Sequence, residues 1–481
     1  MIRRPPRSTL SSSSAASDVY KRQKFNTLKE RLHGVILNKG EQGYEVKGLQ
    51  EKLENLPDSF DSILSFIDEI DLLKIRSDWE YIEPNNIDEI KSSSDPTRSK
   101  TRLPNVNLND ASKKVEAAFL ASLCGCILGK PLEASLTGQE IKNALEQSNQ
   151  WPLKDYVSGS IKEFLPRVHP SHVETTKENI AYVAPDDDIN YTIMGMLILE
   201  KFGTEFTHEN MEELWIHHLP INTTFGPERT RLLNVGLNSL DSVSRSNFLS
   251  KGGVGKSKNK ENYKKRLDAI NDYLNPGDEL CGAAIRADAY GYALPGNPEL
   301  SSELAARDAG FTHNRTGIYG TMFIAALISC SLVMEDKNEI ISTALKYVPQ
   351  KSRFFYRSKL CFEELKQANN WEDGYLKINK LLNEYGHCRI YQEIGMLMNS
   401  FIFANNTSEG ICIQVSQGAD TDSFGATSGS VLGSYYGPSG LDPKWLEPFN
   451  DDIHTGMAWF FERSVSNLAS RMGQLPIKFS K

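Results

Sequence analysis

The sequence predicts an all-helical protein, with a compact helical body over residues 111–470 and a helical extension in front of it. Three observations lead to this fold class. Apolar residues recur at helical spacing through most of the apolar segments. Strict two-residue alternation is scarce, and no series of short strands separated by turns is present. No regular repeat marks a solenoid or a propeller.

Residues 1–23 are set aside from the predicted fold. They contain arginine and serine but no apolar core, so they do not form a secretory signal. They resemble a translated sequencing adaptor. We therefore treat them as a non-native, disordered segment.

Residues 24–110 are expected to form the helical extension and a linker. A helix that Asp58 or Ser59 caps is predicted from apolar residues at helical spacing, which are Phe60, Ile63, Leu64, Ile67 and Ile70. The following stretch, residues 81–110, is polar and contains three prolines. It predicts a linker or a segment that wraps the body.

The main body begins with residues 115–134, which are apolar on nearly every side and therefore predict a helix buried in the core. A second helix is predicted over residues 189–203, with Gly203 as its stop signal. Further helical patterns cover residues 211–219, 283–294, 303–312, 317–334, 374–386 and 390–404. Residues 471–481 are expected to form a short tail.

Composition excludes several classes of function. The 481 residues carry 54 basic and 62 acidic side chains, a net charge of -8, so we expect no binding to nucleic acid or to an anionic membrane. No uninterrupted apolar run approaches the ~18–20 residues of a membrane span. The seven cysteines are scattered and form no CxxC pair. We therefore expect neither a disulfide framework nor a zinc site, and a reducing, cytoplasmic location.

The stretch KGGVGK at residues 251–256 resembles part of a phosphate-binding loop. Such a loop needs a buried strand before it and an amphipathic helix after it. The residues upstream are polar and rich in serine, and the residues downstream have no apolar stripe. We therefore interpret the stretch as a solvated insertion.

Acidic residues gather at two predicted helix starts. Three consecutive aspartates occupy residues 186–188, and Asp420 and Asp422 form a DxD pair that Ser423 follows. An aspartate before a helix is an ordinary N-cap, which explains one acid per helix but not three in a row or a DxD pair. Clustered carboxylates repel one another, so they lie in solvent or neutralise a cation. With a hydroxyl nearby they suit a hard divalent ion such as Mg²⁺.

Glycines follow the second acid pair at four-residue steps, at Gly425, Gly429 and Gly433. In a helix this spacing places all three on one face, which is left bare of side chains. The segment is short and flanked by aspartates, which excludes a membrane-helix interpretation. We expect the backbone of another helix to pack closely against this face.

Four segments, in this order along the chain, resemble the ADP-ribosylglycohydrolases, the ADP-ribosyl-acceptor hydrolase family. AAFLASLCGCILGKPLEA resembles the first family helix, and PDDDINYT stands where the family has T-D-D-T. The block CGAAIRADAYGYALPGNPELSSELAARDAGFTHNRTGIYGTMFIAALIS resembles the middle of the family domain, and GADTDSFGATSGSVLGSYYG its C-terminal signature. The resemblance covers most of residues 111–470. It implies a compact, orthogonal all-α fold, which agrees with the periodicity.

The resemblance also implies an activity and a site. The activity is divalent-metal-dependent hydrolysis of the glycosidic bond at C1'' of ADP-ribose, in ADP-ribosylated proteins or small ADP-ribose conjugates. Two Mg²⁺ ions, or Mn²⁺, are implied between the acid clusters, and catalytic roles fall to Glu133, Asp187 and Asp422. The implied metal ligands are Asp186, Asp187, Asp188, Asp420, Asp422 and Ser423. The implied substrate-binding residues are Gly282 and Ala283, at a turn that holds the pyrophosphate, and His313, Asn314 and Tyr319, along the cleft.

Alternatives stay open at this point. The family that the chain resembles also contains crystallins that reuse the fold without catalysis, and a member that binds ADP-ribose need not turn it over. Retention of both acid clusters argues against a purely structural role, because such repulsion serves no structural purpose. Glu133 can also be a solvated loop residue, His313 a structural histidine, and Arg286 either an internal ion-pair partner or a ligand contact.

Overall fold

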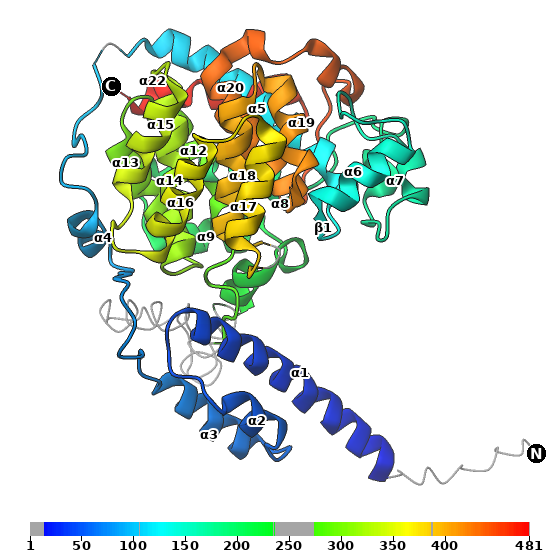
Figure 1. The fold of residues 1–481 in the computed structure, drawn as a ribbon, viewed down its shortest axis with the longest axis vertical. Helices are drawn as coiled ribbons and strands as arrows, with labels where there is room; N and C mark the ends of the chain where they lie inside the picture. The colour runs from blue at the N-terminus through cyan, green and yellow to red at the C-terminus, as the bar shows by residue number, and fades with distance from the viewer. Residues whose placement is uncertain (1–13, 105, 234, 236–273, 386–387, 481) are drawn as a thin grey trace, which may run out of the picture. The chain divides into compact units, whose positions relative to one another are not determined.

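The computed structural model describes residues 14–104, 106–233, 235, 274–385 and 388–480, with side chains from Phe25 onward. The loop that contains KGGVGK lies outside these residues. Helices dominate the described part of the chain, and its one sheet is a short antiparallel pair of β1 (Leu136–Thr137) and β2 (Gly418–Ala419) (Figure 1). The predicted all-helical class is therefore confirmed.

The chain divides into two units. The smaller unit combines Met1–Glu80 with Asp272–Gly277, and the larger unit combines Tyr81–Asn271 with Asp278–Lys481. The larger unit therefore begins at Tyr81, where the polar stretch starts. The sequence analysis placed this boundary at residue 110. Residues 81–110 belong to the larger unit because they pack against its helices.

The smaller unit contains three helices, α1 (Ser14–Glu41), α2 (Leu49–Glu54) and α3 (Phe60–Asp71). Helix α1 begins inside the segment that we set aside as non-native. At the start of α3 the Ser59 side chain accepts a hydrogen bond from the Ser62 N–H, as the capping pattern predicts. The face of α3 that carries Phe66 and Ile67 is buried, whereas Phe60 and Leu64, which we expected on the apolar stripe, are exposed.

The larger unit is built from α-helices that enclose one apolar core. These helices are α4 (Ile87–Ser93), α5 (Leu108–Gly129), α6 (Gly138–Gln147), α7 (His172–Thr175), α8 (Asp187–Phe202), α9 (His208–His218), α12 (Asp288–Ala293), α13 (Pro298–Ala309), α14 (Thr316–Ser331), α15 (Lys337–Ala344), α16 (Arg353–Leu365), α17 (Trp371–Leu382), α18 (Ile390–Phe403), α19 (Thr407–Ser416), α20 (Thr421–Tyr436), α21 (Val465–Gly473) and α22 (Leu475–Phe479). Short 3-10 helices join them, and two of these bear on the site, η1 (Lys130–Leu132) and η5 (Cys281–Arg286).

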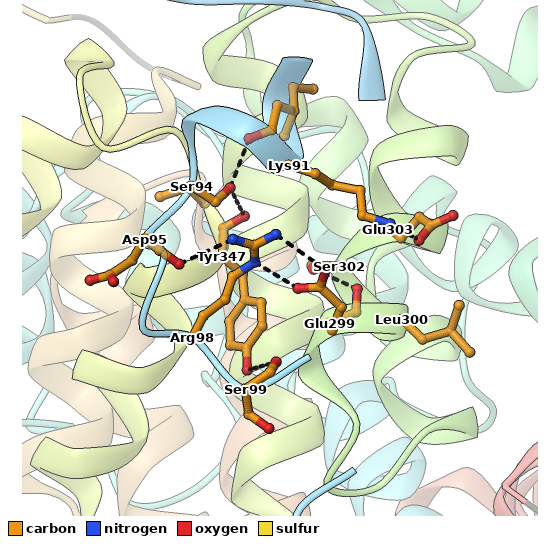
Figure 2. A network of polar contacts seen from close by, with 12 residues as sticks. Lys91, Ser94, Asp95, Arg98, Ser99, Glu299, Leu300, Ser302, Glu303 and Tyr347 are labelled. Carbon is orange, nitrogen blue, oxygen red and sulfur yellow. Dashed lines mark hydrogen bonds and ion pairs between the residues drawn. The ribbon is translucent and has the colours of Figure 1, made fainter. Parts of the chain in front are cut away.

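Residues 81–107, which we call the strap, run over the surface of the larger unit and contain α4. The guanidinium of Arg98 pairs with the Glu299 carboxylate of α13 through two hydrogen bonds of 2.7 and 3.3 Å. Lys91 pairs with Glu303 one turn further along α13, at 2.8 Å (Figure 2). These pairs fix one end of the strap, so the wrapping interpretation of this stretch is confirmed.

The other end of the strap is held by residues from the middle of the chain. Glu83 pairs with Arg353 of α16, with 2.7 Å between the closest charged atoms. The backbone carbonyl of Pro84 accepts a hydrogen bond of 2.6 Å from the hydroxyl of Tyr319. The strap is therefore attached to at least two helices, α13 and α16, that are far from it in sequence.

Helices α5 and α20 pack backbone against backbone at the centre of the larger unit (Figure 1). A Cβ placed on Gly125 would lie 2.0 Å from the carbonyl oxygen of Gly425, and one placed on Gly429 would lie 2.2 Å from that of Ala121. The two helices run antiparallel, because the end of α5 meets the start of α20 at Gly129 and Thr421. The close packing expected at the glycine face is therefore confirmed.

One stretch in the described residues, Leu108–Leu132, is long and apolar enough to cross a membrane by length and composition alone. It consists of α5 and the 3-10 turn that follows. Of its most apolar window, 89% is buried inside the domain. Packing in the core therefore accounts for its apolar composition.

Gly429→Ala tests the packing of α5 against α20. We expect the substitution to lower the free energy of unfolding by about 1–3 kcal/mol or more, although alanine is the better helix former by about 1 kcal/mol. Gly159→Ala is the control, because the nearest atoms to its new methyl group lie 3.5 Å away. Urea denaturation of both variants measures the difference, and equal stabilities would contradict the close packing.

Asp288→Asn tests a buried acid that joins α12 to α20. The Asp288 carboxylate accepts a hydrogen bond from the Ser430 hydroxyl, and burial raises its pKa from 3.8 to about 7. From about pH 4 to about pH 7 the folded protein keeps a proton that the unfolded chain has lost, so native stability falls with rising pH by up to ~1.4 kcal/mol per pH unit. The asparagine variant does not lose stability in this way, because its amide does not titrate.

Thermal unfolding of the native protein and of Asp288→Asn at the two ends of this pH window measures the effect. We expect the Tm of the variant, relative to that of the native protein, to rise from the acidic to the neutral condition. An unchanged difference in Tm would contradict a proton held at Asp288.

Candidate active site

The two acidic helix starts lie at the N-termini of α8 and α20. Asp186 is the N-cap of α8, and its carboxylate accepts a hydrogen bond of 2.9 Å from the Asp188 N–H. Asp420 occupies the N-cap position of α20, but its side chain makes no capping hydrogen bond. Capping therefore explains Asp186 and does not explain Asp420, and the positive end of each helix dipole favours the remaining acids.

A third element brings a lysine and a glutamate to the same place. Lys130 begins η1 directly after α5, and Glu133 follows η1. The Lys130 ammonium lies 2.5 Å from Asp186 Oδ2, 2.8 Å from Asp422 Oδ2 and 3.0 Å from Glu133 Oε2. The structure thus joins both acid clusters and the predicted catalytic glutamate through one cation. We call the six carboxylates the acid site; they are Glu133, Asp186, Asp187, Asp188, Asp420 and Asp422.

Burial and mutual repulsion decide how protons are distributed in the acid site. Burial and then the charge of Asp422 raise the pKa of Glu133 to about 10. Burial alone would also raise the pKa of Asp422, but Lys130 and hydrogen bonds, first of all from Glu133, hold it well below its usual range. Burial and the charge of Asp186 raise the pKa of Asp187 and of Asp188 well above the usual value. In this pair the protonated form is therefore favoured at Glu133 and the ionised form at Asp422.

Thiols and a further acid surround Asp420. The Sγ atoms of Cys281 and Cys388 lie 3.1 and 3.4 Å from Asp420 Oδ2, so both thiols donate to one carboxylate oxygen. The Asp420 N–H donates to Glu393 Oε1 at 3.2 Å, and the Glu393 side chain is fully buried. These contacts fix the backbone and the side chain of Asp420 independently of α20.

The sequence analysis missed Lys130, Glu393 and the two thiols. A signal for two of them is present in the sequence. Lys130 interrupts an otherwise apolar stretch three residues before Glu133, and Glu393 is the one acid in the apolar segment 390–403. A charged residue inside an apolar helix is seldom buried without a partner, so both are candidates for a buried polar contact. The two cysteines carry no comparable signal because they are far apart in sequence.

The donor atoms of the acid site fit a hard divalent cation. Glu133, Asp420 and Asp422 offer carboxylate oxygens that all lie within 4.8 Å of one another. Both carboxylate oxygens of Asp188 are buried and have no hydrogen-bond partner in the described part of the chain. Ser423 follows in the first turn of α20 with a half-buried side chain. Unsatisfied buried oxygens and converging carboxylates are the ligands that Mg²⁺ and Mn²⁺ prefer.

The predicted pyrophosphate turn belongs to the short 3-10 helix η5. Ala283 is buried, and the Glu228 carboxylate oxygens stand 3.0 Å from where a Cβ of Gly282 would be. Arg286, at the end of η5, pairs with Glu228 and with Asp308 of α13, both at 2.5 Å. Of the two roles left open for Arg286, the structure shows the internal ion pair.

The other predicted substrate-binding residues are also buried. His313 shares a hydrogen bond of 2.7 Å with the Thr312 hydroxyl, and burial together with the nearby Arg286 charge lowers its pKa well below the usual value. Asn314 donates to Asp278 at 3.0 Å. Tyr319 donates to the strap, as described above. His313 and Tyr319 are fully buried, so a ligand contact by either requires the surrounding residues to move.

Comparison with known proteins adds a family to this geometry. The family model described as ADP-ribosylglycohydrolase matches residues 107–474, which include the whole acid site. No curated protein matches the chain. A solved structure named "ADP-ribosylglycohydrolase-related protein complex" is similar, with 16% sequence identity, a TM-score of 0.46, and coverage of 77% of this chain and 99% of that one.

Arg286→Met tests the structural role of Arg286. We expect it to lower the free energy of unfolding by about 3–5 kcal/mol, because two acids would stay buried without their cation. Arg463→Met is the control, since the pair of Arg463 with Asp452 is exposed to solvent and such surface pairs contribute little to stability. Urea denaturation of both variants measures the difference, and a similar small cost for each would contradict the internal role.

Proposed function

This chain belongs to the ADP-ribosylglycohydrolase family, and from that premise we propose that it is a divalent-metal-dependent hydrolase that cleaves the glycosidic bond at C1'' of ADP-ribose. The substrates are ADP-ribosylated protein side chains or small ADP-ribose conjugates. The observation that carries the proposal is the convergence of the two acidic helix starts and Glu133 on one place. Six carboxylates gathered there repel one another, and a cation-dependent reaction gives them a purpose.

Glu133, Asp186, Asp188, Asp420 and Asp422 are the carboxylates that would hold the cation, with Asp187 and the Ser423 hydroxyl beside them. Oxygens of Glu133, Asp420 and Asp422 lie within 4.8 Å of one another, and both oxygens of Asp188 lack a hydrogen-bond partner in the described residues. A divalent cation bound there would supply positive charge that orients the ribose hydroxyls and favours the loss of a proton from water.

Glu133 is the residue that moves a proton in this proposal. It lies at the edge of the acid site, where its carboxyl is less buried than those of Asp186 and Asp422. Its raised pKa results in part from the charge of Asp422. A positive charge that compensates Asp422 lowers this pKa and leaves Glu133 ionised, the form that a general base requires.

The proposed reaction is a hydrolysis. One proton of a water molecule moves to the ionised Glu133 carboxylate, and the water oxygen forms a bond to C1''. The bond between C1'' and the acceptor atom breaks, and the acceptor leaves with the proton that Glu133 gives up, which restores the Glu133 carboxylate. Asp187 and Asp422 keep the water and the ribose in place, because a carboxylate accepts hydrogen bonds from both.

The pyrophosphate of the substrate is proposed to lie against Gly282 and Ala283. The acid Glu228 lies next to this turn, and its charge opposes a phosphate. Arg286 offsets that charge through its ion pair with Glu228. In this proposal Arg286 therefore supports substrate binding through Glu228 and does not contact the phosphate.

Asp422→Asn tests the proposed function. We expect native protein with Mg²⁺ to release ADP-ribose from at least one of an arginine, a serine and an O-acetyl conjugate, and the variant to be slower by about 100-fold or more. Asp110→Asn, at the opposite end of α5 and more than half exposed, is the matched control and should keep full activity. Release is measured by chromatography.

Two results would contradict the proposal. One is the absence of release from all three conjugates by folded native protein. The other is release that is equally fast in the presence of a chelator. If ADP-ribose binds without being released from any conjugate, the chain is a binding protein of this family rather than an enzyme.

A further inference from the structure

Lys130 is a buried lysine whose ammonium lies among acids from two other helices. Its side chain is 11% exposed, and those of Asp186 and Asp422 are 1% and 4% exposed. The ammonium lies 2.5 Å from Asp186 Oδ2, 2.8 Å from Asp422 Oδ2 and 3.0 Å from Glu133 Oε2, so it brings a positive charge into the acid site.

The backbone fixes this charge in place. Gly129, the residue before Lys130, packs so closely on α20 that a Cβ there would lie 2.0 Å from the carbonyl oxygen of Thr421. The Thr421 hydroxyl donates a hydrogen bond of 2.8 Å to the Gly129 carbonyl. Pro131 follows Lys130 and restricts the chain on its other side. The backbone of Lys130 therefore has little freedom to move, because both neighbours are held.

An ammonium at this position competes with a divalent ion for the same oxygen atoms. A Mg²⁺ ion binds carboxylate oxygen at about 2.1 Å. A Mg²⁺ ion on Asp422 Oδ2 would therefore stand within about 5 Å of the Lys130 nitrogen, which lies 2.8 Å from that oxygen. Two cations so close repel strongly inside a buried site.

We propose that the Lys130 ammonium takes the place of one divalent cation, so that the acid site holds a single divalent ion on the side of Asp188. This inference rests on the proposed metal-dependent function and makes it more specific. On that side both oxygens of Asp188 are buried without a hydrogen-bond partner in the described residues, whereas the ion pairs of Lys130 go to Glu133, Asp186 and Asp422. Lys130 is thereby a residue that determines metal stoichiometry.

The number of bound ions tests the inference without a measurement of activity. Full-length protein is freed of metal with a chelator and titrated with Mn²⁺, and free and bound Mn²⁺ are counted by electron paramagnetic resonance and elemental analysis. We expect one ion per chain in native protein and two in Lys130→Met. Lys130→Arg keeps the charge and should bind one ion. Lys114→Met, which removes a lysine of α5 outside the acid site, is the control and should also bind one.

Each outcome decides the matter. Two tight ions in native protein, or one ion with unchanged affinity in Lys130→Met, would overturn the inference while leaving a metal-dependent function intact. No Mn²⁺ bound by native protein or by any variant would overturn the metal-dependent function and the inference with it. If Lys130→Met does not fold without metal, the native protein and Lys130→Arg still decide, because each must bind one ion.

Discussion

The close backbone packing of α5 against α20 is the constraint on which the rest of the structure depends. Glycine at positions such as Gly125 and Gly425 removes the side chains that would otherwise separate the two helices. Because the helices run antiparallel, the end of α5 meets the start of α20. Lys130 and Glu133 follow directly after the end of the first helix, and Asp422 lies in the first turn of the second. A wider separation would place these charges out of reach of one another.

That packing concentrates negative charge, and the fold offsets it in three ways. The N-termini of α8 and α20 point at the acids, and a helix N-terminus stabilises a carboxylate. Lys130 pairs with three of the acids. At Glu133 burial and the charge of Asp422 raise the pKa and so favour the neutral form when no cation is bound. The acid site is thereby stable enough to form and still leaves carboxylate oxygens without partners, which is the state that a cation-binding site requires.

Local patterns in the sequence predicted most of the fold. Helical periodicity predicted the all-helical class of the body, and Ser59 was one of two residues predicted to cap α3. The four-residue glycine steps predicted a close contact with another helix, which the structure identifies as α5. The acid clusters were also visible, because consecutive aspartates exceed what capping needs. The family resemblance added Glu133 to the candidate site residues, and the family match over residues 107–474 confirms that resemblance.

Contacts between segments that are far apart in the sequence could not be predicted from local patterns. Lys130 and Asp422 are 292 residues apart, and nothing local to either shows that they meet. The same holds for the hydrogen bond from Cys281 to Asp420 and for the ion pair between Glu83 and Arg353. For His313 and Tyr319 the resemblance assigned a place in a cleft, whereas both are fully buried in the assembled fold, where Tyr319 donates to the strap.

Calorimetric titration of the full-length protein with ADP-ribose, with Mg²⁺ and then with a chelator, tests the central claim most directly. The claim is that the acid site is a cation-dependent ADP-ribose site. It predicts saturable binding to one site per chain with Mg²⁺ and a large loss of affinity with the chelator. Absence of binding by well-folded protein under both conditions would contradict it, and so would equal affinity under both.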